Sequence, residues 1–155
     1  MSTLKNLGLG ACLFFLGLTC ARASEKRVKL ADLPPAVQKT VKEQSKGATI
    51  RGYLQAVENG KTTYEVAMTV HGHGKDVSMD ATGAVVEVEE EVPLASIPVA
   101  AKQAIEKGAA GGKVLKVEAA SNGSGPAQAY EAQVLKDGKR SEVRVSPDGS
   151  PAPEH

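Results

Sequence analysis

The sequence Tyr64-Glu65-Val66-Ala67-Met68 returns later in the chain as Tyr130-Glu131-Ala132-Gln133-Val134. In the first copy apolar and polar side chains alternate, which is the period-two pattern of a strand with one buried and one exposed face. Each copy follows a short helical pattern and precedes a glycine-containing turn and another strand pattern. The chain therefore reads as one structural unit written twice.

The first unit begins with a helix and continues with strands. Leu33-Pro34 opens a helical pattern whose apolar side chains form one face, because proline suits the first turn of a helix. Gly47 ends this helix, and strand patterns follow at residues 50–58, at 62–70, around Val77 and Met79, and at 84–89. We expect a helix laid across a four-stranded antiparallel meander, preceded by a charged, solvated leader at residues 24–31.

The second unit repeats this order. Ile97-Pro98 opens a helix with apolar residues at the same offsets, and strand patterns follow at residues 113–120, 130–134 and around Val143 and Val145. Three prolines at the C-terminal end leave no good fourth strand. The predicted fold class is α+β: two tandem units, each with one helix packed on an antiparallel three- to four-stranded sheet. The predicted boundaries are 24–92 and 93–150, followed by a loose tail at 151–155.

The N-terminal residues 1–23 have the pattern of an export signal. Lys5 precedes an apolar run that ends at Leu18, and Ala21-Arg22-Ala23 is a small-x-small cleavage pattern. The run is shorter than the roughly 20 apolar residues that span a membrane. We expect a periplasmic or secreted protein cleaved near Ala23, without a membrane span. A lipoprotein acylated at Cys20 is the less favoured alternative.

The composition excludes several classes of function. Both cysteines, Cys12 and Cys20, lie in the signal, so residues 24–155 can form neither a disulfide nor a cysteine metal site. Without Lys5 and Arg22 the 19 basic residues fall to 17 against 18 acidic ones. This near-neutral balance argues against a nucleic acid or an anionic membrane as partner.

The catalytic motifs of metalloproteases and serine hydrolases are missing from the sequence, so we expect no enzymatic activity and no cofactor. His71 and His73 are the metal candidates, because residues two apart on a strand-like turn point the same way. The alternative is a polar hairpin tip. The acidic residues Glu87 and 89–91 are interpreted either as a site for a basic partner or cation, or as charge that protects an edge strand.

The sheet face opposite each helix is the predicted working surface. Tyr64 and Tyr130 belong to the buried faces of their strands, so their neighbours belong to the open faces. The candidate partner-binding residues are Tyr53, Glu65, Asp76, Glu131, Gln133, Glu142 and Arg144, with Ser78, Glu87, Lys116 and Glu118 on the same faces. A broad polar surface of this kind suits a protein partner better than a small apolar ligand.

The order of these motifs resembles that of PepSY and PepSY-like domains, the latter similar to the repeats of beta-lactamase inhibitory protein. The first match consists of Leu33-Pro34, Tyr64-Glu65-Val66, Gly74-Lys75 and Asp80-Ala81-Thr82-Gly83, and the second of Ile97-Pro98, Tyr130-Glu131, Asp137-Gly138-Lys139 and Asp148-Gly149. The resemblance implies an exported module of helix plus antiparallel sheet, associated with secreted peptidases and their restraint. It brings no catalytic residues. The inhibitor's disulfides have no counterpart here, so beta-lactamase inhibition is not transferred.

The sequence thus predicts an exported, non-enzymatic binding module. Its sheet surface is expected to bind a protein or peptide partner in the cell envelope, and to modulate a peptidase. The alternative function is an envelope sensor of a metal or small ligand that uses His71 and His73.

Overall fold

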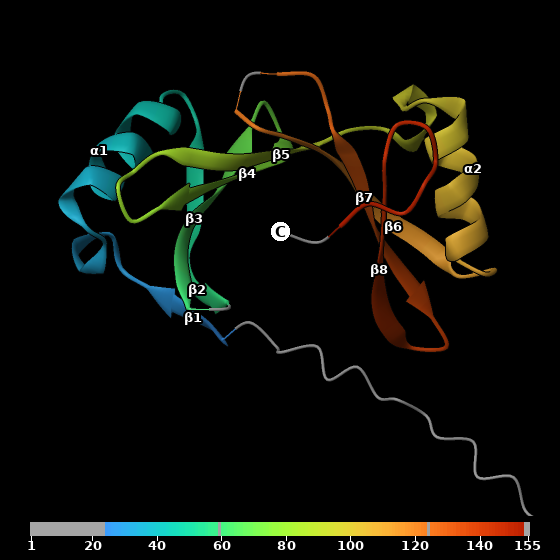
Figure 1. The fold of residues 1–155 in the computed structure, drawn as a ribbon, viewed down its shortest axis with the longest axis horizontal. Helices are drawn as coiled ribbons and strands as arrows, with labels where there is room; N and C mark the ends of the chain where they lie inside the picture. Colours follow the sequence, from blue (N-terminus) through green and yellow to red (C-terminus); the bar gives the residue numbers. More distant parts are fainter. Residues whose placement is uncertain (1–23, 59, 124, 154–155) are drawn as a thin grey trace, which may run out of the picture.

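The computed structural model describes residues 24–58, 60–123 and 125–153. The predicted export signal therefore lies outside the described residues. Within them lie two short helices and eight strands (Figure 1). One strand precedes the first helix, four strands follow it, and three strands follow the second helix. The strands are β1 (Ser24–Val28), β2 (Thr49–Glu58), β3 (Lys61–Val70), β4 (His73–Asp80), β5 (Val85–Glu91), β6 (Lys113–Ser121), β7 (Ala129–Lys136) and β8 (Lys139–Val145).

Both helices begin where the sequence predicts. Helix α1 (Pro35–Gln44) follows the 3-10 turn η1 (Leu30–Asp32), and helix α2 (Val99–Gly108) follows η2 (Leu94–Ser96). Proline precedes each helix, and Pro35 occupies the first turn of α1, where its missing N–H leaves no hydrogen bond unmade. These helix positions are confirmed.

The prediction of two separate helix-on-sheet units is wrong. All eight strands form one antiparallel sheet in sequence order, β1 to β8. The connection is made by β5 and β6, which pair from Val88↔Ser121 to Glu91↔Glu118. The strand patterns are local and specify which face of a strand is buried, whereas they do not specify which free edges meet. Joining the two edges satisfies backbone groups that two separate sheets would expose.

Two terminal segments also differ from the expectation. Residues 25–27 are exposed as expected, but residues 24–28 are not a leader outside the fold, because they form β1 and pair with β2 from Ser24↔Val57 to Val28↔Tyr53. At the other end Pro151 forms a bridge with Val145. The N–H of Ala152 donates to the carbonyl of Arg144 at 3.2 Å. The described start of the predicted tail is therefore held against β8.

Each helix covers its own hydrophobic core. The core under α1 contains Leu33, Val37, Val41, Val66, Met68, Val77, Met79 and Val88, and the core under α2 contains Ile97, Ala101, Ile105, Val117, Ala132 and Val145. Tyr64 and Tyr130 pack against these cores as predicted. Burial of these side chains fixes the alternation of the strands, so their polar neighbours face the other side of the sheet.

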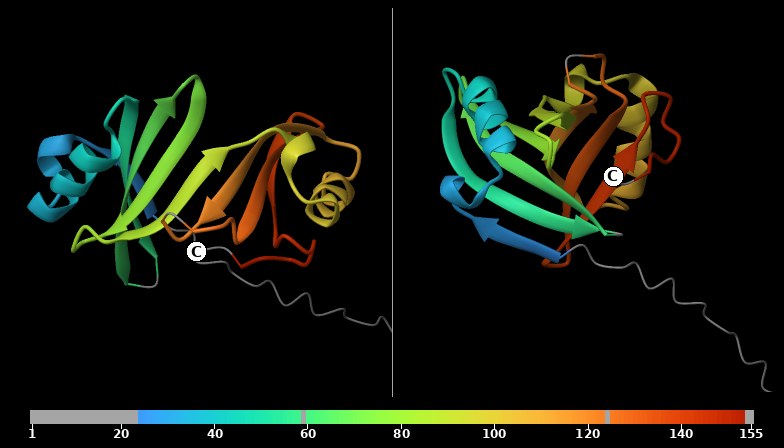
Figure 2. Two further views of the ribbon diagram at one scale, coloured as in Figure 1. Left: turned by 90° about the horizontal axis from the view of Figure 1, so that it is seen from above. Right: turned by 60° about the vertical axis from the view of Figure 1, so that its left-hand side comes forward.

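The continuous sheet bends like an arch. Both helices lie on its outer side at opposite ends, and the inner, concave side carries no helix (Figures 1 and 2). Among the described residues no helix has the length and apolarity needed to cross a bilayer. Because both helices lie on the outer side, the concave face is the broad surface that they leave uncovered.

Candidate functional site

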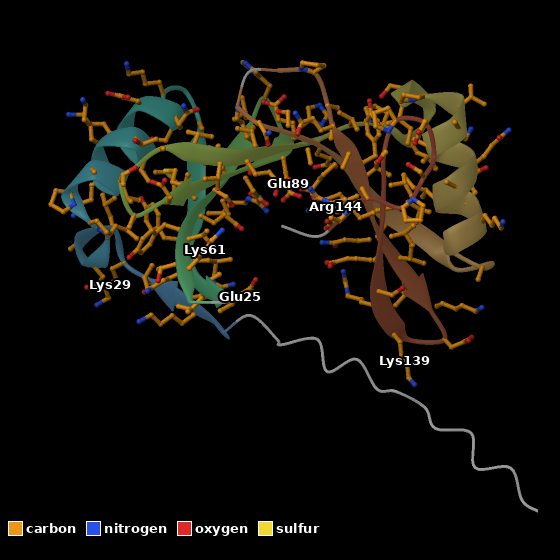
Figure 3. The ribbon with its side chains drawn as sticks, viewed as in Figure 1. Glu25, Lys29, Lys61, Glu89, Lys139 and Arg144 are labelled. Carbon is orange, nitrogen blue, oxygen red and sulfur yellow. The ribbon has the colours of Figure 1, made fainter. Side chains whose placement is uncertain are left out.

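The concave face gathers charged side chains from both halves of the chain. Glu65, Asp76, Glu87 and Glu89 come from β3, β4 and β5, and Glu118 and Glu131 come from β6 and β7. The three basic partners are Arg51, Lys116 and Arg144, which come from β2, β6 and β8. Figure 3 shows Glu89 and Arg144 pointing toward one another beneath the arch. Six carboxyl groups thus face three cations.

Arg144 links the two ends of this group. Its guanidinium forms ion pairs with Glu131 at 3.0 Å and with Glu87, and donates a hydrogen bond to a carboxyl oxygen of Glu89 at 3.2 Å. The side chain is only 7% exposed. Strands β6 and β7 separate β8 from β5. Three strand spacings of about 4.8 Å would put these residues out of reach in a flat sheet. The contact requires the curvature of the arch.

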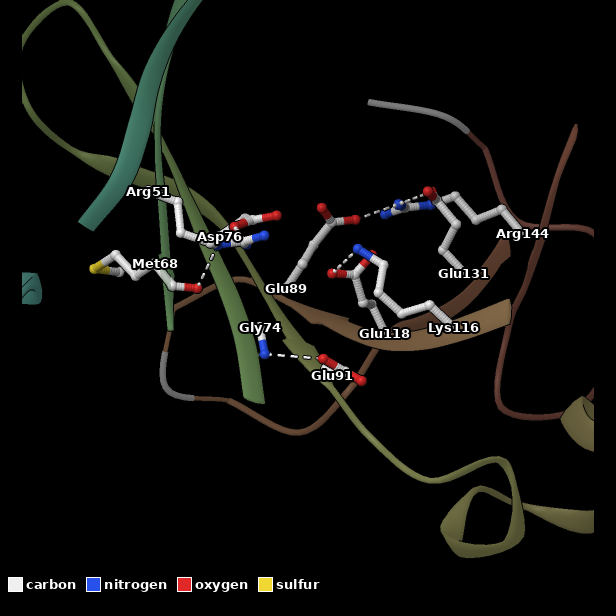
Figure 4. A network of polar contacts seen from close by, with 10 residues as sticks. All are labelled: Arg51, Met68, Gly74, Asp76, Glu89, Glu91, Lys116, Glu118, Glu131 and Arg144. Carbon is white, nitrogen blue, oxygen red and sulfur yellow. Dashed lines mark hydrogen bonds and ion pairs between the residues drawn. The ribbon is translucent and has the colours of Figure 1, made fainter. Parts of the chain in front are cut away.

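Two further ion pairs flank this network (Figure 4). Arg51 pairs with Asp76 at 2.7 Å, and its Nε donates to the carbonyl of Met68 at 3.0 Å. Lys116 lies with its Nζ 2.7 Å from Oε1 of Glu118, whose side chain is 4% exposed. Arg51 on β2 thus pairs with a carboxylate on β4, whereas Lys116 pairs with one on its own strand, β6.

Burial, together with the acidic excess, changes the protonation of two carboxyl groups. Burial, reinforced by Asp76 and other carboxylates, raises the pKa of Glu65 from 4.5 to about 7. Burial and the neighbouring Glu131 raise the pKa of Glu89 to about 8, although Arg144 opposes this shift. At neutral pH Glu89 is therefore mostly protonated, and the charge of Arg144 is balanced chiefly by Glu87 and Glu131.

The pKa values of two further groups on this face are shifted by the same effects, burial and neighbouring charge. Burial raises the pKa of Glu118, and Lys116 opposes the rise. Burial alone would lower the pKa of Arg144, but hydrogen bonds to Glu87 and Glu131 outweigh it and raise that pKa. An additional cation on this face would favour ionisation of the partly protonated carboxyl groups. The face can therefore bind positive charge and release protons as it does so.

The structure places most of the predicted binding residues on this face. Glu65, Asp76, Glu131 and Arg144 lie in or beside the charged network. Gln133 and Glu142 pair with one another farther along β7 and β8. They line a separate hollow of about 330 Å³ with Arg140 and Ser141.

Tyr53 is the exception, and its placement on the open face is wrong. It pairs with Val66 and packs against the core under α1. The cause is a β-bulge between Ile50 and Gly52, which inserts one residue and reverses the alternation after it. Arg51 occupies the bulge and takes part in the network instead.

Sequence reasoning missed the role of Glu89. The acidic residues of β5 were interpreted either as a site for a basic partner or cation or as charge on an edge strand. The edge-strand alternative is wrong, because β5 lies between β4 and β6. The signal that identifies Glu89 is its alternation with the buried Val88. Only the pairing of β5 with β6 brings it near Arg144.

The two histidines are not arranged as the metal prediction assumed. His71 has φ +50° and forms the turn, so only His73 belongs to a strand. Both side chains are exposed. Within the described ranges no three His, Cys, Asp or Glu side chains are grouped so that they could hold a metal ion.

Comparison with known proteins gives a fold and no family assignment. No protein-family model matches the chain, and no curated protein sequence matches it. Solved structures do match. A predicted periplasmic protein of Bacteroides eggerthii has a TM-score of 0.58 at 18% identity, covering 77% of this chain and 85% of its own.

Two further matches carry family descriptions. A DUF2874 family protein of Bacteroides ovatus has a TM-score of 0.55 at 22% identity, with the same coverage of 77% and 85%. A protein of Bacteroides fragilis described as similar to beta-lactamase inhibitory protein has a TM-score of 0.51 at 24% identity, covering 79% of this chain and 86% of its own. The chain shares the fold of these proteins.

Proposed function

We propose that the chain is an exported, non-enzymatic module whose concave sheet face binds a basic segment of a protein or peptide partner. The observation that carries the proposal is the gathering of six carboxyl groups around three cations in the central part of one helix-free face. A positive partner complements this excess of negative charge. The fold shared with proteins described as periplasmic and as similar to an enzyme inhibitor supports a location in the cell envelope.

The pKa values make the proposal measurable. Binding of a cation beside Glu65 or Glu89 favours their ionised forms and lowers their pKa values from about 7 and about 8. The protein then releases protons to the solvent on binding. Calorimetry of one peptide in two buffers with different ionisation enthalpies measures this release directly.

The test uses two labelled peptides of equal length, one alternating lysine with threonine and one alternating glutamate with threonine. We expect the basic peptide to bind with proton release at pH 7.5, and its affinity to fall with added salt. The variant Glu65→Gln, Asp76→Asn, Glu118→Gln should weaken binding by about tenfold, equivalent to about 1.4 kcal/mol. Equal binding of the two peptides would refute the proposal.

A matched variant separates this surface from overall charge. Glu43→Gln, Glu90→Gln and Glu106→Gln remove the same number of charges from exposed positions outside the network. Binding of the basic peptide should be unchanged. A secreted peptidase is the first natural partner to test, because PepSY-like domains are associated with such enzymes. Its rate should change on addition of the protein and not of the concave-face variant.

A further inference from the structure

An apolar groove lies on the opposite side of the sheet, between α1 and β2. Its volume is about 480 Å³, within the range of about 300–1,000 Å³ that small-molecule sites occupy. Val41 and Tyr53 line its interior, and Leu30 and Ile50 line it while remaining 41% and 39% exposed. Two large apolar side chains thus face the same open hollow.

The position of α1 explains why this hollow exists. The hydroxyl of Thr40 donates to the carbonyl of Gly83 at 2.7 Å, at the turn between β4 and β5. Gly83 has φ +82°, and a Cβ there would lie 2.6 Å from the carbonyl oxygen of Ala36. The hydrogen bond from Thr40, and the absence of a side chain at Gly83, allow α1 to pack closely over the β4–β5 turn. The side of the helix that faces β2 is left with space beside it.

The rim of the groove is positively charged. Lys39 and Lys42 both line it, one helical turn apart on α1, and its lining contains no carboxylate. Neither lysine forms an ion pair with a residue in the described ranges. The groove therefore combines an apolar interior with two available cations at its edge.

The other half of the molecule lacks this combination. Counting from the proline before each helix, Gln103 and Glu106 of α2 stand where α1 has Lys39 and Lys42. Counting from the bulge in each strand, Val117 stands where β2 has Tyr53, and it is only 3% exposed. The apolar groove with a basic rim is thus specific to the α1 side.

We propose that this groove binds a free fatty acid, with its alkyl chain against Leu30, Ile50 and Tyr53 and its carboxylate at Lys39 and Lys42. Apolar burial supplies most of the affinity, at about 0.8 kcal/mol for each buried CH₂. The lysines select a negative headgroup. This site is independent of the concave face and of the function proposed for it.

The charge of the molecule favours a free fatty acid over a membrane surface. Residues 24–155 contain 17 basic and 18 acidic residues, so the protein as a whole is not attracted to anionic lipid. Two lysines at the edge of the groove suit one carboxylate, whereas stable adsorption to a membrane requires a larger basic patch.

The experiment measures displacement of 11-(dansylamino)undecanoic acid by dodecanoate, with dodecyltrimethylammonium as a ligand of equal chain length and opposite charge. We expect dodecanoate to displace the probe and the cationic amphiphile to compete at least about tenfold more weakly, equivalent to about 1.4 kcal/mol. Lys39→Glu with Lys42→Glu should weaken dodecanoate by about tenfold and reverse this preference. Octanoate should bind more weakly, because it buries a shorter chain.

The matched control is Lys102→Glu with Lys107→Glu, which makes the same charge change on α2 and should leave binding unchanged. Circular dichroism verifies that both double variants fold. Three outcomes would overturn the proposal: no displaceable probe binding, equal loss in both variants, or binding to anionic vesicles without binding of monomeric dodecanoate. Retained basic-peptide binding in the α1 variant would show that the concave face is unaffected.

Discussion

Substitution of Glu89 by glutamine should stabilise the protein in mildly alkaline solution. The pKa of Glu89 is about 8 in the folded protein, against an ordinary value of 4.5, because burial and the neighbouring Glu131 disfavour its charge. The folded protein therefore holds this proton more tightly than the unfolded chain does. The stability that the proton provides is complete below pH 4.5 and is lost as the pH rises through 8.

The magnitude follows from these two pKa values. Between pH 5 and pH 8 the difference in proton binding lowers the free energy of unfolding by about 3 kcal/mol. Glutamine has no proton to lose and keeps an oxygen that accepts from Arg144. Glu89→Gln should thus be about 4 kcal/mol more stable than the parent at pH 8, and within about 1 kcal/mol of it at pH 5.

The assay is urea unfolding followed by far-ultraviolet circular dichroism from pH 5 to pH 8.5. With a slope of about 2 kcal/mol per M, the gain at pH 8 moves the midpoint by about 2 M. Glu90→Gln is the control, because Glu90 is 56% exposed on the same strand. If Glu89→Gln has the same pH dependence as the parent protein, the assignment of Glu89 to a desolvated acidic network is wrong.

Four further substitutions test the architecture by the same measurement. Arg144→Met should cost about 3–5 kcal/mol at pH 8, because it leaves carboxylates without their cation, and less at pH 5; an equal cost at both pH values would contradict this reasoning. Gly83→Ala should cost about 3 kcal/mol, since its Cβ would meet α1, whereas Gly47→Ala meets no atom within 4 Å and should cost about 1 kcal/mol for its φ of +76°. Val66→Asp, at a position with 0% exposure, should unfold the protein, and a native spectrum would disprove the assigned strand face.

The local patterns of the sequence account for the elements and for most of the concave face. Glu65 and Asp76 were placed correctly because each alternates with a buried residue, Val66 and Val77. The same reasoning failed at Tyr53, because a bulge changes the count by one. Gly52 beside the bulge was the signal, since an isolated glycine within a strand often marks one.

The chain by itself determined the helix starts, the strand faces and the turns, since these depend on side-chain period and on residues close in sequence. Tertiary structure decided that β5 and β6 join the two halves, that β1 completes the sheet, and that Arg144 reaches Glu87 and Glu89. These features depend on which strand edges meet and how far the sheet bends. The repeated Tyr-Glu stretch thus identified the two cores, whereas the shared sheet created the charged surface between them.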